Sequence, residues 1–368
     1  MIGAALNYRD ILRDFESVPN DTYRQVEDFL SATSAGRRYL LGRNQSALAL
    51  SHVVGIDGFV DDFADEAALW HGKPVIKIAD LDAGSVVVNC SMSISPVSAL
   101  ARLKASRSGA VLNYSDIYRV RPELIPIPDF IRTTREDYQK NEVRLLHLYE
   151  RLKDEHSRFV MKALAGYRLT GDPAYMMDFR VRFSEQYFEN FLNMTEAVFV
   201  DAGGFDGDTT EEFCKHYPAY KKIFLFEPSH RNIEAAKKRL SGYRNIEFAQ
   251  LGLSDSAGSL WFNPDAGSAS AVSADGAERI EVTTLDSFTD ERVTFIKMDL
   301  EGWELKALHG SARHIAEDQP ALAISVYHNP SDYWRIYEYV MGIRDDYAVY
   351  LRHYTEGWSE TVMFFVPH

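Results

Sequence analysis

Residues 197–203 read AVFVDAG, and GFDG follows at 204–207. An apolar run that ends in an acid and a glycine is typical of a strand that enters a tight turn. Thr209 and Glu212 then have the spacing of a capping box, so we expect a helix to begin there. The stretch therefore predicts a strand, a glycine turn and a helix, which is the opening unit of an α/β domain.

The same alternation of strands and helices continues to residue 368. Strands are predicted at 197–203, 222–228, 246–254, 278–285, 293–300, 321–328, 347–354 and 361–368, with helices between them. Only EGWSE (356–360) separates the last two strands, which indicates an antiparallel hairpin. A mostly parallel, Rossmann-like sheet that ends in an antiparallel pair is the architecture of class I methyltransferases.

The glycine turn and the acids around it predict a site for S-adenosylmethionine. Backbone amides at the start of the helix can hold the methionyl carboxylate. Gly203 and Gly207 would let the backbone approach a ligand where a β-carbon would collide. Asp201 or Asp206 would accept a hydrogen bond from the α-ammonium group of the cofactor.

Two later strand ends extend this site. Glu227 follows the second strand, where its carboxylate can accept from both ribose hydroxyls. Ser229 can cap the next helix. Ser254 and Asp255 are expected at the end of the third strand, where Asp255 would accept from the adenine amino group; the alternative is that Asp255 simply forms a turn.

A nicotinamide dinucleotide would use a similar turn, but the fingerprint for it is missing. Counted from Gly203, Phe205 and Asp208 stand where G-x-G-x-x-G needs its second and third glycines. Counted from Gly204, the pattern fails at Asp206. A methyltransferase is therefore the main prediction. A protein that binds the methyl donor without turnover is the alternative, and an NAD-dependent oxidoreductase is less favoured than either.

The second half of the chain resembles the FkbM-type methyltransferase family. The matching phrases are FVDAGGFDGDTT, FLFEPS, LGLSDSAGS, VTTLDSF, FIKMDLEGWELKALHG, ISVYHNPSDYWRI and YLRHYTEGWSETV. The resemblance implies a class I fold, S-adenosylmethionine as donor and an O-methylated product, often a sugar hydroxyl in a glycan, a nucleotide sugar or a glycosylated metabolite. Phe205 departs from the small polar residue of many members.

The residues expected to act on the acceptor come from the next two strand ends. Asp299 and Glu301 end the fourth core strand, and His328 ends the following one. Because open α/β sheets bind ligands at the carboxyl ends of their strands, we expect these three to meet. Asp299 would lie near the methyl group and His328 would be the general base. The same three residues also offer oxygen and nitrogen ligands for a divalent ion, but no spacing motif supports a metal, so none is expected.

The first half predicts a second, smaller α/β domain. We expect a helical lead-in at 1–36, a small Rossmann-like domain at 37–125, a helical linker at 126–195 and the methyltransferase domain at 196–368. In the small domain, strands are expected at 38–42, 53–62, 73–78, 85–90 and 109–114. Its glycines at 42, 55 and 58 lie at possible strand ends, where a nucleotide-like or sugar-like ligand could bind. A role of these glycines in packing is favoured over a ligand site.

Composition limits the partners. A formal charge of −14 argues against a nucleic-acid phosphate tract as partner, and no apolar run is long enough for membrane insertion. With two cysteines and no signal-peptide core, we expect free, buried thiols and a cytoplasmic location. The expected partner is a small-molecule or glycan substrate, and a homo-oligomer stays open.

Overall fold

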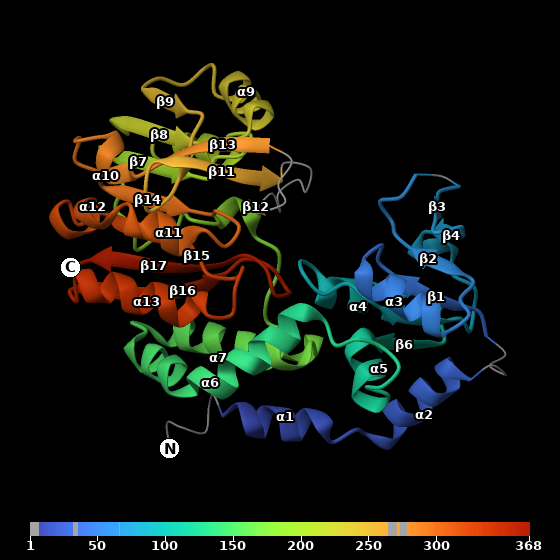
Figure 1. The fold of residues 1–368 in the computed structure, drawn as a ribbon. Coiled ribbons are helices and arrows are strands. Elements are labelled where there is room, and N and C mark those ends of the chain that lie inside the picture. Colours follow the sequence, from blue (N-terminus) through green and yellow to red (C-terminus); the bar gives the residue numbers. More distant parts are fainter. Residues whose placement is uncertain (1–6, 32–35, 66, 264–270, 273–277) are drawn as a thin grey trace. The chain divides into compact units, whose positions relative to one another are not determined.

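The computed structural model describes residues 7–31, 36–65, 67–263, 271–272 and 278–368 (Figure 1). Contacts group the chain into two compact units, each made of several segments. The first comprises Met1–Leu146, Met161–Val181 and Tyr354–Ser359, and the second comprises His147–Val160, Arg182–His353 and Glu360–His368. The stretch expected as a helical linker is thus divided between the two units, and so is the hairpin near the C-terminus.

The first unit contains a six-stranded sheet. Its order is β3 (Leu69–Trp70), β4 (Lys73–Ile76), β2 (Gly58–Val60), β1 (Arg38–Leu41), β5 (Val86–Asn89) and β6 (Ala110–Asn113). All pairs are parallel except β3 with β4. The expected strands are confirmed, although the one at 53–62 is shorter because α3 extends to Val53.

Helices surround this sheet in the first unit. They are α1 (Tyr8–Glu16), α2 (Asn20–Leu30), α3 (Gln45–Val53), α4 (Pro96–Lys104) and α5 (Tyr114–Val120), with 3₁₀ turns at Ile78–Asp80 and Pro173–Met176. Two longer helices, α6 (Asp129–Arg151) and α7 (Glu155–Thr170), contribute residues to both units. Asn141 has non-helical dihedral angles inside α6, which marks a kink.

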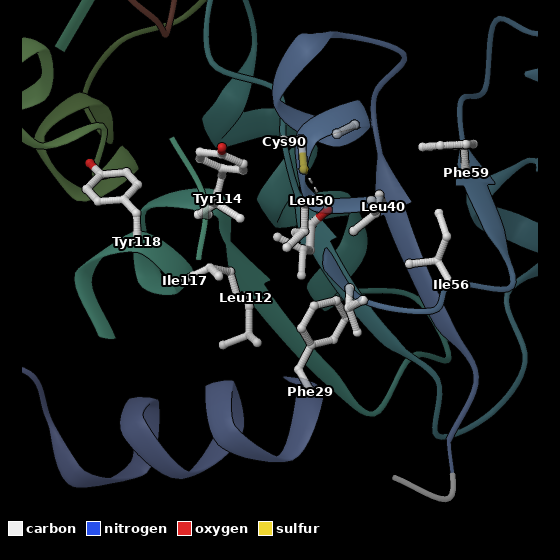
Figure 2. Packing of buried hydrophobic residues seen from close by; sticks show 14 of the residues in the cluster. Phe29, Leu40, Leu50, Ile56, Phe59, Cys90, Leu112, Tyr114, Ile117 and Tyr118 are labelled. Atoms are coloured by element: carbon white, nitrogen blue, oxygen red, sulfur yellow. Dashed lines mark hydrogen bonds between the residues drawn. The ribbon is translucent and has the colours of Figure 1, made fainter. Parts of the chain in front are cut away.

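One apolar cluster holds the first unit together. Figure 2 shows Phe29 from α2, Leu40 from β1, Leu50 from α3, and Leu112 and Ile117 from β6 and α5 gathered in it. Four of these side chains are fully buried and Leu112 is nearly so. Burying each such side chain stabilises the fold by roughly 1.5–3 kcal/mol. The cluster therefore ties the N-terminal helix α2 to the sheet.

The glycines of the small domain have packing roles. Gly42 has a φ of +106° and follows β1 directly. Asn44 then caps α3 by accepting from the Ala47 amide, and its own amide donates to the Cys90 carbonyl. A β-carbon on Gly58 would lie 2.6 Å from the Pro74 carbonyl oxygen. These contacts agree with the packing role expected for Gly42 and Gly58, whereas a β-carbon on Gly55 would meet nothing within 4 Å.

The second unit contains the seven-stranded sheet expected from the sequence. Its order is β16 (Tyr347–His353), β17 (Thr361–Pro367), β15 (Ala321–Ser325), β14 (Phe295–Met298), β7 (Val198–Ala202), β8 (Lys222–Phe226) and β9 (Ile246–Ala249). Only β17 runs antiparallel, and it lies between β15 and β16. This is the Rossmann-like class I methyltransferase fold, with helices around a mostly parallel sheet (Figure 1).

A separate four-stranded sheet confirms one expectation and corrects another. Its order is β10 (Gly252–Leu253), β13 (Glu278–Thr283), β11 (Gly258–Asn263) and β12 (Ala271–Val272). The strand expected at 278–285 is confirmed as β13, which lies in this smaller sheet. The strand expected at 246–254 is broken, because β9 ends at Ala249 and β10 pairs with β13 instead. Ser254 and Asp255 therefore follow β10 and not the third core strand.

The helices of the second unit follow the expected positions. They are α8 (Asp208–His216), α9 (His230–Arg239), α10 (Leu285–Phe288), α11 (Glu304–His309), α12 (Ala312–Glu317) and α13 (Asp332–Ile343), with a 3₁₀ turn at Phe183–Glu185. Ser229 caps α9 as expected, by accepting from the Asn232 amide. The capping box of Thr209 and Glu212 is wrong, since α8 begins one residue earlier, with Gly207 as its N-cap.

Three further features concern the cysteines, Asp286 and the lengths of the helices. Cys90 and Cys214 are free and buried. Asp286 caps a helix, although not the one that it belongs to: its carboxylate accepts from the amides of Arg313 and His314 at the start of α12. Within the described ranges, no helix combines the length and the apolar character that a membrane span requires.

Candidate active site

The turn after β7 brings backbone segments into close contact. Gly203 and Gly207 have φ angles of +80° and +83°, and Phe205 between them has +44°. A β-carbon on Gly203 would lie 2.0 Å from the Asp299 carbonyl oxygen, and one on Gly207 would lie 2.9 Å from Leu240 Cδ1. The glycines are thus required first by packing of this loop against the loop after β14 and against α9.

Asp201 lies at the bottom of this site and is fully buried. Its Oδ1 accepts from Lys297 Nζ at 3.0 Å, and its Oδ2 accepts from Thr210 Oγ1 at 2.6 Å. Burial alone would lower the pKa of Lys297, but the carboxylates of Asp201 and Asp299 raise it above its ordinary value. Both oxygens of Asp201 are therefore engaged within the protein.

Asp206 lies nearer the surface of the same turn. Its Oδ2 pairs with Arg239 of α9, and Arg239 also donates to the Asp206 carbonyl at 3.0 Å. The other carboxylate oxygen, Oδ1, is buried and has no hydrogen-bond partner among the described residues. Of the two acids considered for the α-ammonium group, Asp206 is the one that has a carboxylate oxygen without a hydrogen-bond partner among the described residues.

Glu227 connects the loop after β7 to the end of β8. Its Oε2 accepts from the Phe205 amide at 3.0 Å, and its Oε1 accepts from the Ser229 amide at 2.9 Å and from Asn232 Nδ2 at 3.4 Å. Burial raises the pKa of Glu227, although these hydrogen bonds oppose the shift. A carboxylate offers about four lone-pair positions, so Glu227 can still accept from a ligand.

Ser254 and Asp255 contact α11 and its start. Ser254 Oγ accepts from Trp303 Nε1 at 3.2 Å, and Asp255 Oδ2 lies 2.6 Å from Lys306 Nζ. The hydrogen bond from Lys306 lowers the pKa of Asp255. The structure thus gives Asp255 a partner on α11, at a position where we had expected an adenine contact.

Asp299 follows β14 and receives hydrogen bonds from two tyrosines. Tyr187 donates to its Oδ2 at 2.9 Å, and Tyr327 donates to its Oδ1 at 3.4 Å. Tyr187 also lies 3.2 Å from Ser325 Oγ. Burial and the neighbouring Asp299 carboxylate raise the pKa of Tyr187 well above its ordinary value, so Tyr187 stays a hydrogen-bond donor.

The three acceptor-side residues expected from the sequence meet in the structure. His328 Nε2 lies 3.2 Å from Glu301 Oε2 and 3.5 Å from Asp299 Oδ1. Its Nδ1 lies 2.9 Å from Oε1 of Glu304, which begins α11. Burial alone would lower the pKa of His328, but Glu304, Glu301 and Asp299 raise it well above its ordinary value.

Glu360 and Gln186 border the same group. Gln186 Nε2 donates to Glu360 Oε2 at 2.8 Å. Burial and the Asp299 carboxylate raise the pKa of Glu360 to about 7. Glu360 has a φ of +65° and Glu301 has +53°, in a region that costs a non-glycine residue about 1–3 kcal/mol. Strain of this kind clusters at functional sites, and here it adjoins Asp299.

Sequence reasoning missed several members of this site: Gln186, Tyr187, Lys297, Glu304 and Glu360. Lys297 carried a usable signal, because a lysine inside the apolar run FIKM needs a buried partner. Tyr187 and Gln186 carried none, since they lie in irregular chain more than 100 positions from Asp299 or Glu360. Only the folded chain places them there.

The arrangement therefore has two neighbouring parts along the carboxyl edge of one sheet. Around β7 and β8 lie the glycine turn, the free oxygen of Asp206 and the carboxylate of Glu227. Around β14 and β15 lie Asp299, Glu301 and His328. The first part suits a ligand with hydroxyl and ammonium donors, and the second suits a polar group with a proton to lose.

Comparison with known proteins finds a matching family model and similar solved structures. Residues 201–355 match the model described as the methyltransferase FkbM domain. The chain is similar to a methyltransferase FkbM from Methylobacillus flagellatus KT, with 24% identity, a TM-score of 0.73 and coverage of 99% of this chain and 98% of that one. At this identity the likeness concerns the fold. No curated protein matches the chain.

Other solved structures resemble only part of the chain. A putative rRNA methylase from Clostridium thermocellum is 10% identical, covering 53% of this chain and 94% of its own, with a TM-score of 0.32. An Aeropyrum pernix fibrillarin with natively bound S-adenosyl-L-methionine is 13% identical, covering 50% and 71%, with a TM-score of 0.33. Both likenesses are too low to support an argument about substrate.

Proposed function

From the methyltransferase FkbM domain that residues 201–355 match, we propose that this protein O-methylates a sugar hydroxyl in a glycan, a nucleotide sugar or a glycosylated metabolite. The domain is that of a methyltransferase, and its cofactor is S-adenosylmethionine. The observation that carries the proposal is the hydrogen bond from the Phe205 amide to Glu227, which joins the glycine turn of β7 to the acidic end of β8.

The residues at this edge fit the donor. We propose that Glu227 accepts from the ribose hydroxyls with the lone pairs that its three protein donors leave. We propose that Asp206 accepts from the α-ammonium group with its buried, unpartnered Oδ1. Asp201 supports the turn from below through Thr210 and Lys297. Gly203 and Gly207 keep the turn close to the sheet, and Ser254 and Asp255 border the adenine end.

S-adenosylmethionine supplies a methyl group on a sulfonium, whose S–C bond breaks as the acceptor oxygen forms its new O–C bond. Asp299 and Glu301 would hold the acceptor hydroxyl, since both project from the loop after β14. The hydroxyl proton would pass to one of these carboxylates. His328 suits this role less than expected, because its surroundings favour the protonated ring. Tyr187 and Tyr327 would keep Asp299 oriented.

The test has a binding arm and a transfer arm. Calorimetry with S-adenosylmethionine, S-adenosylhomocysteine and NADH should give binding for the first two and none for NADH. Transfer is followed by mass spectrometry of glycans and metabolites from cells with the gene present or deleted, where a difference of one methylene on a sugar is expected. Binding without any transfer would favour a non-catalytic donor-binding protein, and NADH binding alone would overturn the proposal.

A matched pair of variants localises the donor site. Asp206→Asn removes the charge of the proposed ammonium acceptor. Glu212→Gln removes an equal charge from a half-buried position on α8 that, like Asp206, is ion-paired. The first should weaken S-adenosylmethionine binding by about tenfold or more, as expected for a lost hydrogen bond to a charged group. The second should leave the affinity unchanged. Equal effects would remove Asp206 from the site.

A further inference from the structure

We infer that a divalent metal ion binds between Asp299, Glu304 and His328, beside Glu301, at the carboxyl edge of the seven-stranded sheet. The inference that a metal binds depends only on the positions of these residues. The inference that the metal takes part in catalysis depends in addition on the proposed function. No spacing motif in the sequence indicated such a site, because its ligands come from two strand ends and a helix. Glu304 in particular was not among the residues that the sequence suggested.

The distances suit a common ion. Asp299, Glu304 and His328 each offer one ligand atom, and these atoms lie within 4.8 Å of one another. Ligands bound at about 2.1 Å lie roughly 3.0–3.4 Å apart when adjacent and roughly 4.2 Å apart when opposite. Small side-chain adjustments would therefore bring all three to one centre. Glu301 Oε2, 3.2 Å from His328 Nε2, is close enough to be a fourth ligand.

Two of the side chains have polar atoms that the protein does not use. His328 is 9% exposed and Glu304 is 1% exposed. Neither ring nitrogen of His328 has a hydrogen bond of acceptable geometry within the described part of the chain, despite the carboxylates nearby, and Glu304 Oε2 has none either. The other oxygen of Glu304 is anchored, since it accepts from the amides of Leu300 and Gly302.

Buried polar atoms without partners are costly, typically by about 1–3 kcal/mol each, and in native proteins they point to an unseen ion or water. Here an oxygen and two ring nitrogens share one small volume. The fixed Oε1 of Glu304 holds the free Oε2 in position. A cation coordinated by Oε2 and by one ring nitrogen would satisfy both side chains at once.

The charge around the site is strongly negative. Asp299, Glu301 and Glu304 face His328 directly, and Asp332 and Glu360 act on it from α13 and from the start of β17. The buried cation Lys297, on which the Asp299 charge also acts, is paired with Asp201. A divalent ion would compensate this negative charge.

The donor set favours a particular class of metal. Carboxylates suit Mg²⁺, Ca²⁺ and Mn²⁺, whereas imidazole suits first-row transition metals. A site with two or three carboxylates and one imidazole fits Mn²⁺ best, because this ion accepts both kinds of ligand. Three protein ligands would leave positions open for the acceptor. An acceptor with two neighbouring oxygens, such as adjacent sugar hydroxyls, would fill two of them and lose its proton more easily.

The experiment uses the full chain, freed of metal by chelation and dialysis. Mn²⁺ is titrated in, and the free ion is followed by electron paramagnetic resonance. We expect one Mn²⁺ per chain, and a dissociation constant at least about tenfold weaker in Asp299→Asn and in His328→Ala, as for lost metal ligands. Glu317→Gln removes a charge from the exposed end of α12 and should bind as the unaltered chain does.

The possible outcomes separate the inference from the proposed function. Absence of stoichiometric Mn²⁺ binding, or equal binding by all four proteins, would overturn the metal site. A variant that fails to fold, judged by circular dichroism, is replaced by Glu301→Gln, which should weaken binding less than the other two. S-adenosylmethionine binding is measured on the same samples. If the unaltered chain does not bind S-adenosylmethionine, the proposed function is refuted, independently of the result for Mn²⁺.

Discussion

Lys297 Nζ lies 3.0 Å from Asp201 Oδ1, and the two residues are direct register partners on the adjacent strands β14 and β7. Their side chains are 3% and 0% exposed. Lys297 also donates to the Gly203 carbonyl at 2.7 Å, and its ammonium lies 5.4 Å from the centre of the Tyr187 ring. One buried cation thus joins the glycine turn to the residues that hold Asp299.

Lys297→Met should destabilise the second unit strongly. The substitution leaves the Asp201 carboxylate buried without its cation, and breaking a buried pair costs about 3–5 kcal/mol. Denaturant unfolding of the variant measures this change in the free energy of unfolding. Lys237→Met, which removes a lysine from an exposed pair on α9, should change it by less than about 0.5 kcal/mol.

The double variant Asp201→Asn with Lys297→Met extends this test. With both charges gone, most of the loss should be recovered, since no uncompensated charge stays buried. A double variant as unstable as the single one would show that Lys297 acts through packing and not through its charge.

Gly203→Ala should destabilise the fold, whereas Gly242→Ala should not. A β-carbon at Gly203 would lie 2.0 Å from the Asp299 carbonyl oxygen, and its φ of +80° disfavours any side chain. We expect a loss of at least about 2 kcal/mol from the combined clash and backbone strain. A β-carbon at Gly242 meets nothing within 4 Å. Thermal melts of both variants measure the difference.

Glu227→Gln should weaken donor binding more than it weakens the fold. The carboxylate accepts from the amides of Phe205 and Ser229, and a carboxamide can replace only one of its two oxygens as an acceptor. Loss of a hydrogen bond to a charged group costs roughly 1.5–3 kcal/mol, so S-adenosylmethionine affinity should fall roughly 10- to 150-fold. Calorimetry with an unchanged affinity would remove Glu227 from the donor site.

Acid unfolding should depend on Asp154. Burial alone would raise the pKa of this carboxyl, but hydrogen bonds from Arg352 and Ser157 lower it to about 2. A lowered pKa gives stability that is present above the ordinary value of 3.8 and is lost as the pH falls towards about 2. In Asp154→Asn, the free energy of unfolding should therefore fall less steeply between these pH values. Its dependence on pH near neutrality should be unchanged. Unfolding followed by circular dichroism measures both.

Glu356 should stabilise the start of α4 in the first unit, although it lies between β16 and β17 in the sequence. Its carboxylate accepts from the Ser98 amide at 2.7 Å and from the Ser98 hydroxyl, in the first turn of α4. Glu356→Ala removes this cap and should cost about 1–2 kcal/mol. Hydrogen exchange should accelerate at the start of α4. Unchanged protection there would contradict the capping role.

Periodicity and turn residues determined most of the fold from the sequence alone. Every strand of the seven-stranded sheet was predicted, because a buried parallel strand is a short apolar run wherever it pairs. Polar residues at the carboxyl ends of those runs also predicted that Asp299, Glu301 and His328 would meet. These features depend on local pattern and on the common direction of parallel strands.

Only the tertiary structure decided which polar atoms are free. Only the fold shows that Lys297 and Thr210 donate to the two oxygens of Asp201. His328 looked like a base, yet three carboxylates surround it. The strand expected at 246–254 is broken, because β10 pairs with β13 and not with the main sheet. Partners and electric fields come from residues distant in sequence, so no local pattern contains them.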